Sequence, residues 1–329
     1  MDWALVNISK SIKNYLKLGR FFGASTTFGC ILVGALTSTA NINVLDAGKL
    51  LLIAIMAHSY MASLNEYWHI EEDKKNPQFQ YKPLVRGDIS LRNALIFILF
   101  SFITTIILTI VFYPNLLSFI FIILAAAFGT LYTVKGKYIA WLYDFTPSTG
   151  AFFLVIYGAT TKGDITTITI VAAICAFFVS VYGEWIGGMK DVDIDRKFNV
   201  KTTAVRWNYS YEKSLSFKDP NFLYFLWIVI SIDIFYSMPF LFNLISPTYF
   251  YIFLLIAIPV QFYLIYRLYG KQNKESLRKH PLFFLGSMNF LAFLLVIDKI
   301  TIWGVMIILT FILGWVYVFS LFRVTFSKD

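Results

Sequence analysis

The sequence contains few charged residues for its length. Charged side chains make up 14% of the 329 residues, whereas a soluble domain usually carries about 25%. Hydrophobic residues make up 58% of the chain, and the mean hydropathy is +0.68. This composition excludes an ordinary soluble globular domain and predicts an integral membrane protein surrounded by membrane lipid.

Cysteine and the usual ligand-binding motifs are also scarce. The two cysteines, Cys30 and Cys175, both lie in apolar segments, which argues against a disulfide framework. The sequence shows neither a glycine-rich nucleotide-binding loop nor the ligand spacing of a zinc site. The net charge of +9 could suggest nucleic acid, but basic loop residues explain it in a membrane protein. No nucleic-acid partner is therefore expected.

The first twenty residues do not resemble a signal peptide. They carry scattered charge instead of a compact apolar core and a cleavage site. This pattern predicts a basic amphipathic helix that lies on the membrane surface. We therefore expect a cytoplasmic amphipathic segment over residues 1–20 and a single transmembrane domain over residues 21–329.

Apolar runs long enough to cross a bilayer, about 17–25 residues, occur ten times in the sequence. The ninth run is the shortest and the weakest candidate. We therefore expect an all-α, polytopic membrane bundle of nine to ten transmembrane helices. The runs cover residues 21–39, 48–65, 93–113, 115–133, 143–161, 164–187, 222–244, 247–266, 281–297 and 300–322.

The basic residues are distributed unevenly between the predicted loops. If the N-terminus lies in the cytoplasm, 25 of the 28 lysines and arginines fall on the cytoplasmic side, and the other three are Lys49, Lys162 and Lys299. Cytoplasmic loops of membrane proteins carry such an excess of positive charge. The long polar loops 66–92 and 188–221 would then both face the cytoplasm, and we expect an active site on that side of the cell membrane.

Each long polar loop begins with acidic residues at helical spacing. Residues four apart share one face of a helix, and this spacing relates Asn65, His69 and Asp73, and also Asp191 and Asp195. Clustered carboxylates repel one another and are usually held by cations. Oxygen ligands without cysteine suit Mg²⁺, so two such groups could clamp a diphosphate between two Mg²⁺ ions. Solvated helix ends with salt bridges to nearby lysines are the alternative.

Several segments resemble the motifs of a known family. The spacing at 65–73, followed by KPLVRG at 82–87, resembles the first motif of the UbiA superfamily of intramembrane prenyltransferases, Asn-Asp-x-x-Asp-x-x-x-Asp and then Arg-Pro-Leu. The segment KDVDIDRKFNVKTTAV at 190–205 resembles the second motif, Asp-x-x-x-Asp followed by Gly-x-Lys/Thr-Thr. Residues 15–36 are similar to the family's first helix.

The sequence departs from these motifs at four positions. Glu66 stands where Asp is usual, which keeps the carboxylate. His69 replaces the second Asp, which removes a hard oxygen ligand and adds an imidazole. Lys82 replaces Arg, so a bidentate phosphate contact becomes a point charge. Asn199 replaces Gly.

The resemblance implies both a fold and an activity. The fold is a helical bundle around a central cavity. The activity is Mg²⁺-dependent transfer of a polyprenyl group from its diphosphate to a lipophilic acceptor, which can be aromatic or a lipid. The implied ligands of two Mg²⁺ ions are Asn65, Glu66, Asp73, Asp191 and Asp195.

Other residues near the motifs are candidates for binding and catalysis. The candidate diphosphate contacts are Arg20, Lys82, Lys135, Lys137 and Lys190. The candidate catalytic residues are His69, Tyr132 and Glu184. An interfacial tyrosine among loop lysines is the alternative for Tyr132, and a buried, hydrogen-bonded acid is the alternative for Glu184. Asp144 begins the fifth run and is expected to cap that helix.

Two other functions are compatible with the sequence. A terpene cyclase on the same scaffold would let the carbocation react with its own chain, and the altered first motif keeps this alternative open. A cation-coupled transporter would also use paired acids, but transporter sites usually lie near the membrane midplane on broken helices. The acids in this sequence lie at predicted helix ends, which favours an enzyme.

Overall fold

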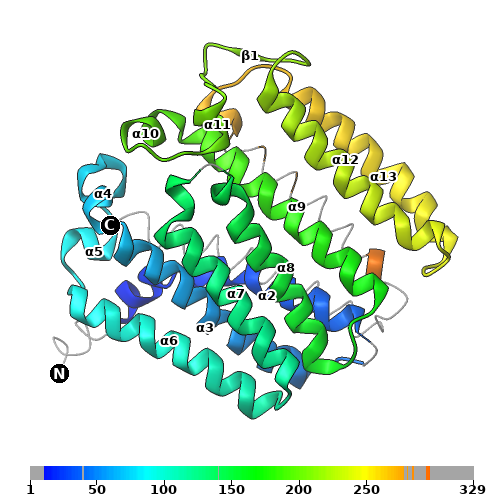
Figure 1. Cartoon of the computed structure of the whole chain (residues 1–329), viewed down its shortest axis with the longest axis horizontal. Coiled ribbons are helices and arrows are strands. Elements are labelled where there is room, and N and C mark those ends of the chain that lie inside the picture. Colours follow the sequence, from blue (N-terminus) through cyan, green and yellow to red (C-terminus); the bar gives the residue numbers. More distant parts are fainter. Residues whose placement is uncertain are drawn as a thin grey trace.

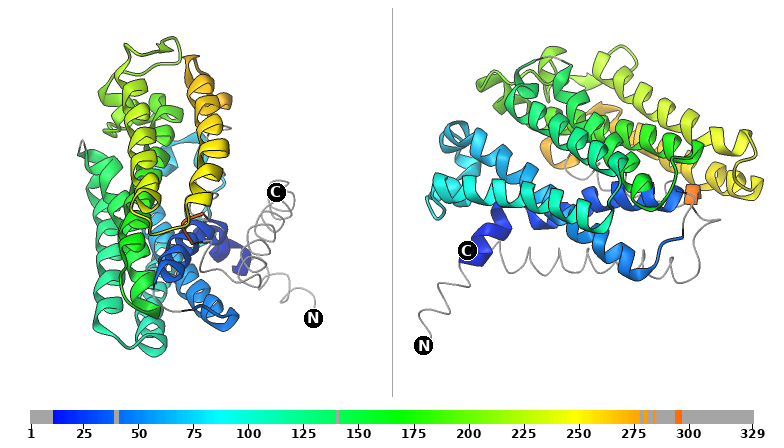
Figure 2. Two further views of the ribbon diagram at one scale, coloured as in Figure 1. Left: turned by 90° about the vertical axis from the view of Figure 1, so that its right-hand side faces the viewer. Right: turned by 60° about the horizontal axis from the view of Figure 1, so that its bottom comes forward.

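The computed structural model of the chain describes residues 11–38, 41–139, 141–277, 280, 284 and 294–296. Over these residues the chain forms an all-α bundle, as expected, in which long helices run side by side (Figure 1 and Figure 2). The long helices are α2 (Ala24–Thr37), α3 (Val44–Trp68), α6 (Leu91–Phe112), α7 (Leu116–Val134), α8 (Leu142–Lys162), α9 (Thr167–Lys190), α12 (Pro220–Leu241) and α13 (Pro247–Leu268).

These long helices match the first eight predicted spans. Within the described part of the chain, six of them are long and apolar enough to cross a membrane, namely α3, α6, α7, α9, α12 and the Phe250–Leu268 part of α13. Helix α2 is shorter but also apolar. The spans predicted over 281–297 and 300–322 lie almost wholly outside the described residues. The total of nine to ten helices therefore stays a prediction.

The connections after α3 and α9 are built in the same way. In each, one residue near ψ = 0 ends the long helix: His69 (φ −100°, ψ 17°) after α3 and Asp191 (φ −108°, ψ 13°) after α9. A six-residue helix and then a four-residue helix follow. These are α4 (Ile70–Lys75) with α5 (Pro83–Arg86), and α10 (Val192–Lys197) with α11 (Thr203–Arg206). Figure 1 shows all four short helices at one end of the bundle.

The remaining connections contain single turns and one small sheet. The 3-10 turns are η1 (Phe21–Gly23), η2 (Pro77–Phe79) and η3 (Gly136–Tyr138). Strands β1 (Ser214–Leu215) and β2 (Gly270–Lys271) pair antiparallel, with Ser214 opposite Lys271 and Leu215 opposite Gly270. The sheet joins the segment before α12 to the segment after α13.

Polar side chains determine where several long helices begin. Asn43 and Asp46 form a capping box at the start of α3, in which each side chain accepts from the backbone N–H of the other. Each such cap is worth about 1 kcal/mol. Side chains also cap α6, α7, α9 and α12, and they belong to Ser90, Asn115, Thr166 and Asp219. Fixed starting points for α3 and α9 set the positions of the acidic residues at their far ends.

Helices α2 and α8 cross at two glycines. A Cβ on Gly34 would lie 1.8 Å from the backbone oxygen of Val155, and a Cβ on Gly158 would lie 1.9 Å from that of Ile31. Small residues let helix backbones approach closely in a membrane, where packing and not the hydrophobic effect holds helices together. This crossing joins the first part of the bundle to its centre.

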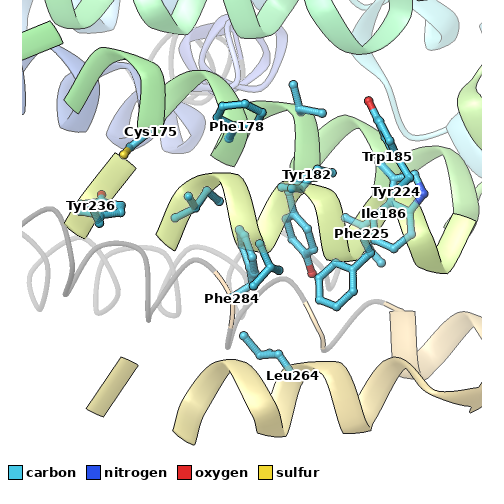
Figure 3. Packing of buried hydrophobic residues seen from close by; sticks show 14 of the residues in the cluster. Cys175, Phe178, Tyr182, Trp185, Ile186, Tyr224, Phe225, Tyr236, Leu264 and Phe284 are labelled. Carbon is cyan, nitrogen blue, oxygen red and sulfur yellow. The ribbon is translucent and has the colours of Figure 1, made fainter. Parts of the chain in front are cut away.

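Aromatic side chains pack α9 against the later helices. Tyr182 stacks on Phe284 with ring centroids 3.5 Å apart, and Trp185 stacks on Phe225 at 5.5 Å. All four side chains are buried, and Figure 3 shows them gathered between neighbouring helices. Aromatic pairs of this kind add about 0.5–1.5 kcal/mol each beyond the area that they bury. The packing fixes α9, whose C-terminal end carries Asp191.

One added methyl group tests the crossing of α2 and α8. Gly34→Ala places a Cβ against the Val155 carbonyl, so the helices must separate. We expect the free energy of unfolding to fall by about 1–3 kcal/mol, as overpacking usually costs, and we expect a lower thermal midpoint in detergent micelles. Gly29→Ala in the same helix is the control, because no neighbouring atom lies within 4 Å of its added Cβ. Equal midpoints for the two variants would contradict this packing.

Candidate active site

The first acidic group begins with Glu66 in the last turn of α3. Glu66 is buried, and its Oε1 accepts a hydrogen bond from Nε of Arg20 at 3.2 Å. Arg20 precedes η1 and has a left-handed backbone, with φ 44° and ψ 47°. The other carboxylate oxygen, Oε2, is buried and has no hydrogen-bond partner within the described residues. Because an unpaired buried polar atom is costly, this oxygen is suited to a cation.

Asp73 and Lys82 complete the first group with a buried ion pair. Lys82 Nζ lies 2.6 Å from Oδ2 of Asp73, and the two side chains are only 7% and 8% exposed. The backbone N–H of Asp73 donates to the oxygen of His69 at 2.9 Å, so the predicted four-residue spacing persists across the helix break. The predicted metal ligand and the predicted diphosphate contact are therefore neighbours in the folded protein.

His69 is buried between the first group and the end of α7. Its Nε2 lies 3.1 Å from the carbonyl oxygen of Thr133. Its Nδ1 lies 3.1 Å from Oε2 of Glu72 and 3.3 Å from the hydroxyl of Tyr138, which also donates to Glu72. Burial, and then the positive charge of Lys137, lowers the pKa of His69 to about 4. Both ring nitrogens of this predicted catalytic residue thus face protein atoms.

Lys137 lies between the two acidic groups. Its Nζ is 3.5 Å from Oδ1 of Asn65 in the first group, and its positive charge opposes the rise that burial causes in the pKa of Asp195 in the second group. Its backbone oxygen accepts from the N–H of Lys201 at 2.9 Å. Burial, followed by nearby positive charges, lowers the pKa of Lys137 to about 8. The turn that carries Lys137 therefore contacts both of the connections that carry the acids.

The second acidic group lies where α9 ends. Lys190 Nζ lies 3.2 Å from Oδ2 of Asp191, and the two side chains are 33% and 37% exposed. Four residues later, Asp195 has one buried oxygen, Oδ2, without a hydrogen-bond partner within the described residues. Burial, and then the negative charge of Asp191, raises the pKa of Asp195 to about 7. The second acidic group therefore also contains a buried carboxylate oxygen to which no described residue donates a hydrogen bond.

Glu184 and Tyr132 form a polar pair deeper in the bundle. The hydroxyl of Tyr132, on α7, donates to Oε2 of Glu184, on α9, at 3.0 Å. Lys137 Nζ lies 5.9 Å from the centroid of the Tyr132 ring. Two of the three residues that the sequence indicated as catalytic are thus in contact with each other and adjoin Lys137.

Asp144 has a different place from the one predicted. Trp141, without a side-chain cap, is the N-cap residue of α8, so the expectation that Asp144 caps this helix is wrong. Asp144 is fully buried, and its carboxylate accepts hydrogen bonds from Thr203 and, at 3.3 Å, from Tyr224. These contacts tie α8 to the segment after the second acidic group. Local spacing could not indicate them, because the partners lie 59 and 80 residues away.

Lys135 stands apart from the other predicted contacts. It is the C-cap residue of α7, and its side chain is exposed. The ion pairs that hold the acidic groups involve Arg20, Lys82 and Lys190. The structure therefore assembles four of the five predicted basic residues around the acids and leaves Lys135 at the surface.

The donor atoms fit Mg²⁺ shared between protein and substrate. Glu66 Oε2 and Asp195 Oδ2 are buried oxygens that have no donor in the part of the chain that the structure describes. The described ranges contain no group of three or more His, Cys, Asp or Glu side chains that could hold a metal by themselves. Mg²⁺ usually takes one or two carboxylates and completes its shell with water and substrate phosphates. A zinc site closed by protein ligands does not fit this arrangement.

An apolar cavity begins one helical turn below the first acidic group. It is partly open and lies among α2, α3, α6, α7 and α8. Met61, on its wall, precedes Asn65 by four residues on α3. The side chains that line it include Ala57, Tyr60, Met61, Phe102, Ala125 and Ala126. A molecule with a charged head at the acidic groups would meet apolar side chains here with its tail.

Sequence comparisons relate the chain to prenyltransferases. The profile of the UbiA prenyltransferase family matches residues 25–288. The digeranylgeranylglyceryl phosphate synthase of Thermococcus gammatolerans is 30% identical over 179 residues, which are 53% of this chain and 63% of that protein. The enzyme of the same name from Korarchaeum cryptofilum is 25% identical over 255 residues, which are 74% of this chain and 84% of that protein.

Solved structures share the fold. A digeranylgeranylglyceryl phosphate synthase superposes with a TM-score of 0.68 at 19% identity, over 88% of this chain and 99% of that one. A UbiA homologue from Archaeoglobus fulgidus bound to GPP and Mg²⁺ gives a TM-score of 0.63 at 16% identity, over 86% of this chain and 99% of that one. The profile match over residues 25–288, most of the sequence, shows that the chain belongs to the UbiA prenyltransferase family.

Proposed function

We propose that the protein transfers a prenyl group from its diphosphate to a lipophilic acceptor in a Mg²⁺-dependent reaction. The observation that carries this proposal is that the turn of Lys137 contacts both acidic connections: its Nζ lies 3.5 Å from Oδ1 of Asn65, and its backbone oxygen accepts from the N–H of Lys201, six residues after Asp195, at 2.9 Å. A diphosphate requires divalent cations and basic side chains in one place, and this end of the bundle offers carboxylates and lysines together.

Both the acids and the bases of the site would take part in binding. Mg²⁺, when bound, neutralises the negative charge that grows on the diphosphate as the allylic carbon–oxygen bond breaks. The residues that would hold it are Asn65, Glu66, Asp73, Asp191 and Asp195. The residues that would contact phosphate oxygens are Arg20, Lys82, Lys137 and Lys190. Because most of these acids and bases are already paired, a magnesium diphosphate would exchange partners with them and leave no buried charge uncompensated.

The Tyr132–Glu184 pair is placed to handle the acceptor. Its hydrogen bond lies beside Lys137, which we propose as a diphosphate contact. When the acceptor oxygen forms its bond to the allylic carbon, the proton that it loses would pass to Glu184, directly or through the Tyr132 hydroxyl. Tyr132 would also present its ring to the positive charge that develops on the prenyl group.

The apolar cavity would receive the prenyl tail. Each buried CH₂ group contributes about 0.8 kcal/mol, and the cavity starts one turn from the residues proposed to hold the diphosphate. The same apolar walls would keep water away from the reacting carbon. Ala125 and Ala126 matter most here, because their small side chains leave the space open.

The names of the relatives suggest the class of acceptor. Both sequence relatives are digeranylgeranylglyceryl phosphate synthases, a name that describes a product with two geranylgeranyl groups on glyceryl phosphate. We therefore propose geranylgeranyl diphosphate as donor and a glyceryl phosphate lipid that already carries one prenyl group as acceptor. A lipid acceptor also suits a site at the end of a membrane bundle, where a phosphate head and an apolar chain can bind together.

The two alternatives differ in what they require of the structure. A cation-coupled transporter usually places its acids near the middle of broken helices, whereas these acids follow the ends of α3 and α9. A terpene cyclase would use the same acids and the same cavity. It would differ in its product, since no acceptor would be consumed.

One carboxylate from each acidic group tests the proposed activity. Asp73→Ala and Asp191→Ala should each lower Mg²⁺-dependent diphosphate release from geranylgeranyl diphosphate by about 100-fold or more, the usual loss when one electrostatic contact to the transition state is removed. Glu71→Gln is the matched control, because Glu71 lies beside the first group but is exposed and paired with Lys74. Full release by both alanine variants would reject the proposal.

The same assay separates transfer from cyclisation. Mass spectrometry should show one added geranylgeranyl group on the glyceryl phosphate lipid and no product when the acceptor is left out. Cyclic hydrocarbons or alcohols formed without acceptor would identify a cyclase instead.

Filling the apolar cavity tests the place of the tail. Ala126→Phe should raise the KM for geranylgeranyl diphosphate by about tenfold, the equivalent of one or two buried CH₂ groups, and should change the KM for dimethylallyl diphosphate little. Ile120→Phe on the exposed side of the same helix is the control. If both donors respond equally to Ala126→Phe, the tail does not bind in this cavity.

The protonation of Asp195 predicts a pH effect on Mg²⁺ binding. Its pKa of about 7 means that the carboxyl is protonated below pH 7, and a metal must displace that proton. With inorganic diphosphate present, Mg²⁺ affinity measured by calorimetry should fall by up to about tenfold per pH unit below 7. Asp195→Asn should bind Mg²⁺ more weakly and with a flatter pH profile. An unchanged profile in Asp195→Asn would contradict this role.

A further inference from the structure

His69 and Asp191 occupy equivalent places but face different surroundings. Both end a long helix with nearly the same backbone angles, and each accepts at its backbone oxygen from the N–H of an acid four residues later. The Asp191 side chain is 37% exposed and reaches Lys190, whereas His69 is 4% exposed and turned toward α7. His69, whose position is equivalent to that of the proposed metal ligand Asp191, therefore contacts other groups.

The contact of His69 with α7 satisfies an otherwise unpaired group. The last four carbonyls of a helix lack partners within the helix, and Thr133 is the penultimate residue of α7. A carbonyl oxygen only accepts hydrogen bonds, so the Nε2 atom that lies 3.1 Å from it must carry a hydrogen. An Nε2–H group directed at a carbonyl has no lone pair to offer to a metal ion, and the lone pair of the neutral ring lies on Nδ1, which faces Glu72 and Tyr138.

The other side of the ring is connected to the turn η3. Nδ1 lies 3.1 Å from Oε2 of Glu72 and 3.3 Å from the Tyr138 hydroxyl, and Tyr138 donates to Glu72. Tyr138 directly follows Lys137 in η3. His69 thus contacts the residues on both sides of the segment that carries Lys137, with Thr133 before it and Tyr138 after it.

The turn η3 is also held from the second half of the bundle. The N–H of Lys201 donates to the backbone oxygen of Lys137 at 2.9 Å. On its inner side, Gly136 packs so closely on Thr146 that a Cβ would lie 2.9 Å from Oγ1. With the contacts to His69, the turn has fixed neighbours on three sides, which limits the positions open to the Lys137 side chain.

We propose that His69 is a positioning residue that fixes the turn carrying Lys137 against the first acidic group, and that it is not a ligand of Mg²⁺. The inference rests on the proposed function only in so far as Lys137 contacts the diphosphate. An aspartate, the usual residue here in the resembling motif, would bring a carboxylate against the Thr133 carbonyl in place of the Nε2–H group. The carbonyl oxygen cannot donate to it, so this contact would become repulsive.

Two substitutions at His69 give opposite expectations for a positioning residue and a metal ligand. His69→Gln keeps an N–H near the place of Nε2 and should keep kcat/KM within about threefold of wild type. His69→Asp should raise the KM for geranylgeranyl diphosphate by about tenfold or more and leave the Mg²⁺ concentration for half-activation within about twofold. A metal ligand would show the reverse, with activity and Mg²⁺ affinity kept by Asp and lost with Gln, and that result would overturn the proposal.

A double-substitution cycle tests the connection to Lys137. If His69 acts through Lys137, adding His69→Ala to Lys137→Ala should lower kcat/KM by less than about threefold beyond Lys137→Ala alone. If the losses in kcat/KM from the two substitutions multiply instead, His69 and Lys137 act independently, and the proposed connection between them is contradicted. Thermal midpoints of all variants separate misfolding from a local effect, and His69→Gln keeps the test decisive if His69→Asp does not fold.

A spectroscopic measurement completes the test without catalysis. The chain has three histidines, so selective ¹⁵N-histidine labelling, with His69→Gln for assignment, resolves the signals of His69. We expect a protonated Nε2 both without ligand and with saturating Mg²⁺ and inorganic diphosphate. Loss of the Nε2 proton on addition of Mg²⁺ would overturn the proposal. Because this measurement needs no turnover, it distinguishes a failure of this inference from a failure of the proposed activity.

Discussion

The structure depends on holding two groups of like charge close together at the end of an apolar bundle. Asp73 and Asp195 come from opposite halves of the chain, and the turn of Lys137 contacts the connection that carries each of them. Carboxylates repel one another strongly where water is scarce, so such an arrangement requires cations. The protein supplies them as Arg20, Lys82 and Lys190 at the individual acids, and as Lys137 between the groups. The turn η3 is accordingly where the two halves of the bundle meet.

The rest of the fold positions the two acidic groups near the turn η3. Capped helices of fixed length bring both acidic groups to the same end, the glycine crossing of α2 and α8 joins the first helices to the centre, and aromatic packing fixes α9. The apolar cavity then lies directly beneath the charged residues. The charged end of the bundle suits the diphosphate of a prenyl diphosphate, and the apolar space inside the bundle suits its prenyl tail. The charged part and the apolar part therefore each lie among groups of their own kind.

Much of this could be predicted from the sequence, because membrane spans and acidic motifs are local signals. Length and apolarity gave the first eight helices, and four-residue spacing placed Asp73 and Asp195 relative to the helix ends. The family and the enzyme class predicted from the motifs are confirmed by the family match. The roles of the individual site residues stay predictions, as do the number of Mg²⁺ ions and the cytoplasmic orientation.

The contacts that the sequence could not indicate are those made across the bundle. Glu72 lies off the four-residue face of the first motif, and Tyr138 is one more aromatic residue in a loop, yet both contact His69. Asp144 stood at an apparent helix start and instead binds Thr203 from a distant segment. Lys135 and Lys137 looked equivalent in sequence, but only the second points into the site, because the two residues lie on opposite sides of a tight turn.

The central claim is that both acidic groups share one ligand, and binding of inorganic diphosphate in the presence of Mg²⁺ tests it most directly. Calorimetry on the wild type, Asp73→Asn, Asp191→Asn and the double variant gives the four affinities of a complete cycle. The account predicts that each single change weakens binding and that the double change weakens it by less than the product of the two, because both carboxylates act on the same molecule. Losses that multiply independently, or a variant that binds as tightly as the wild type, would contradict a shared ligand.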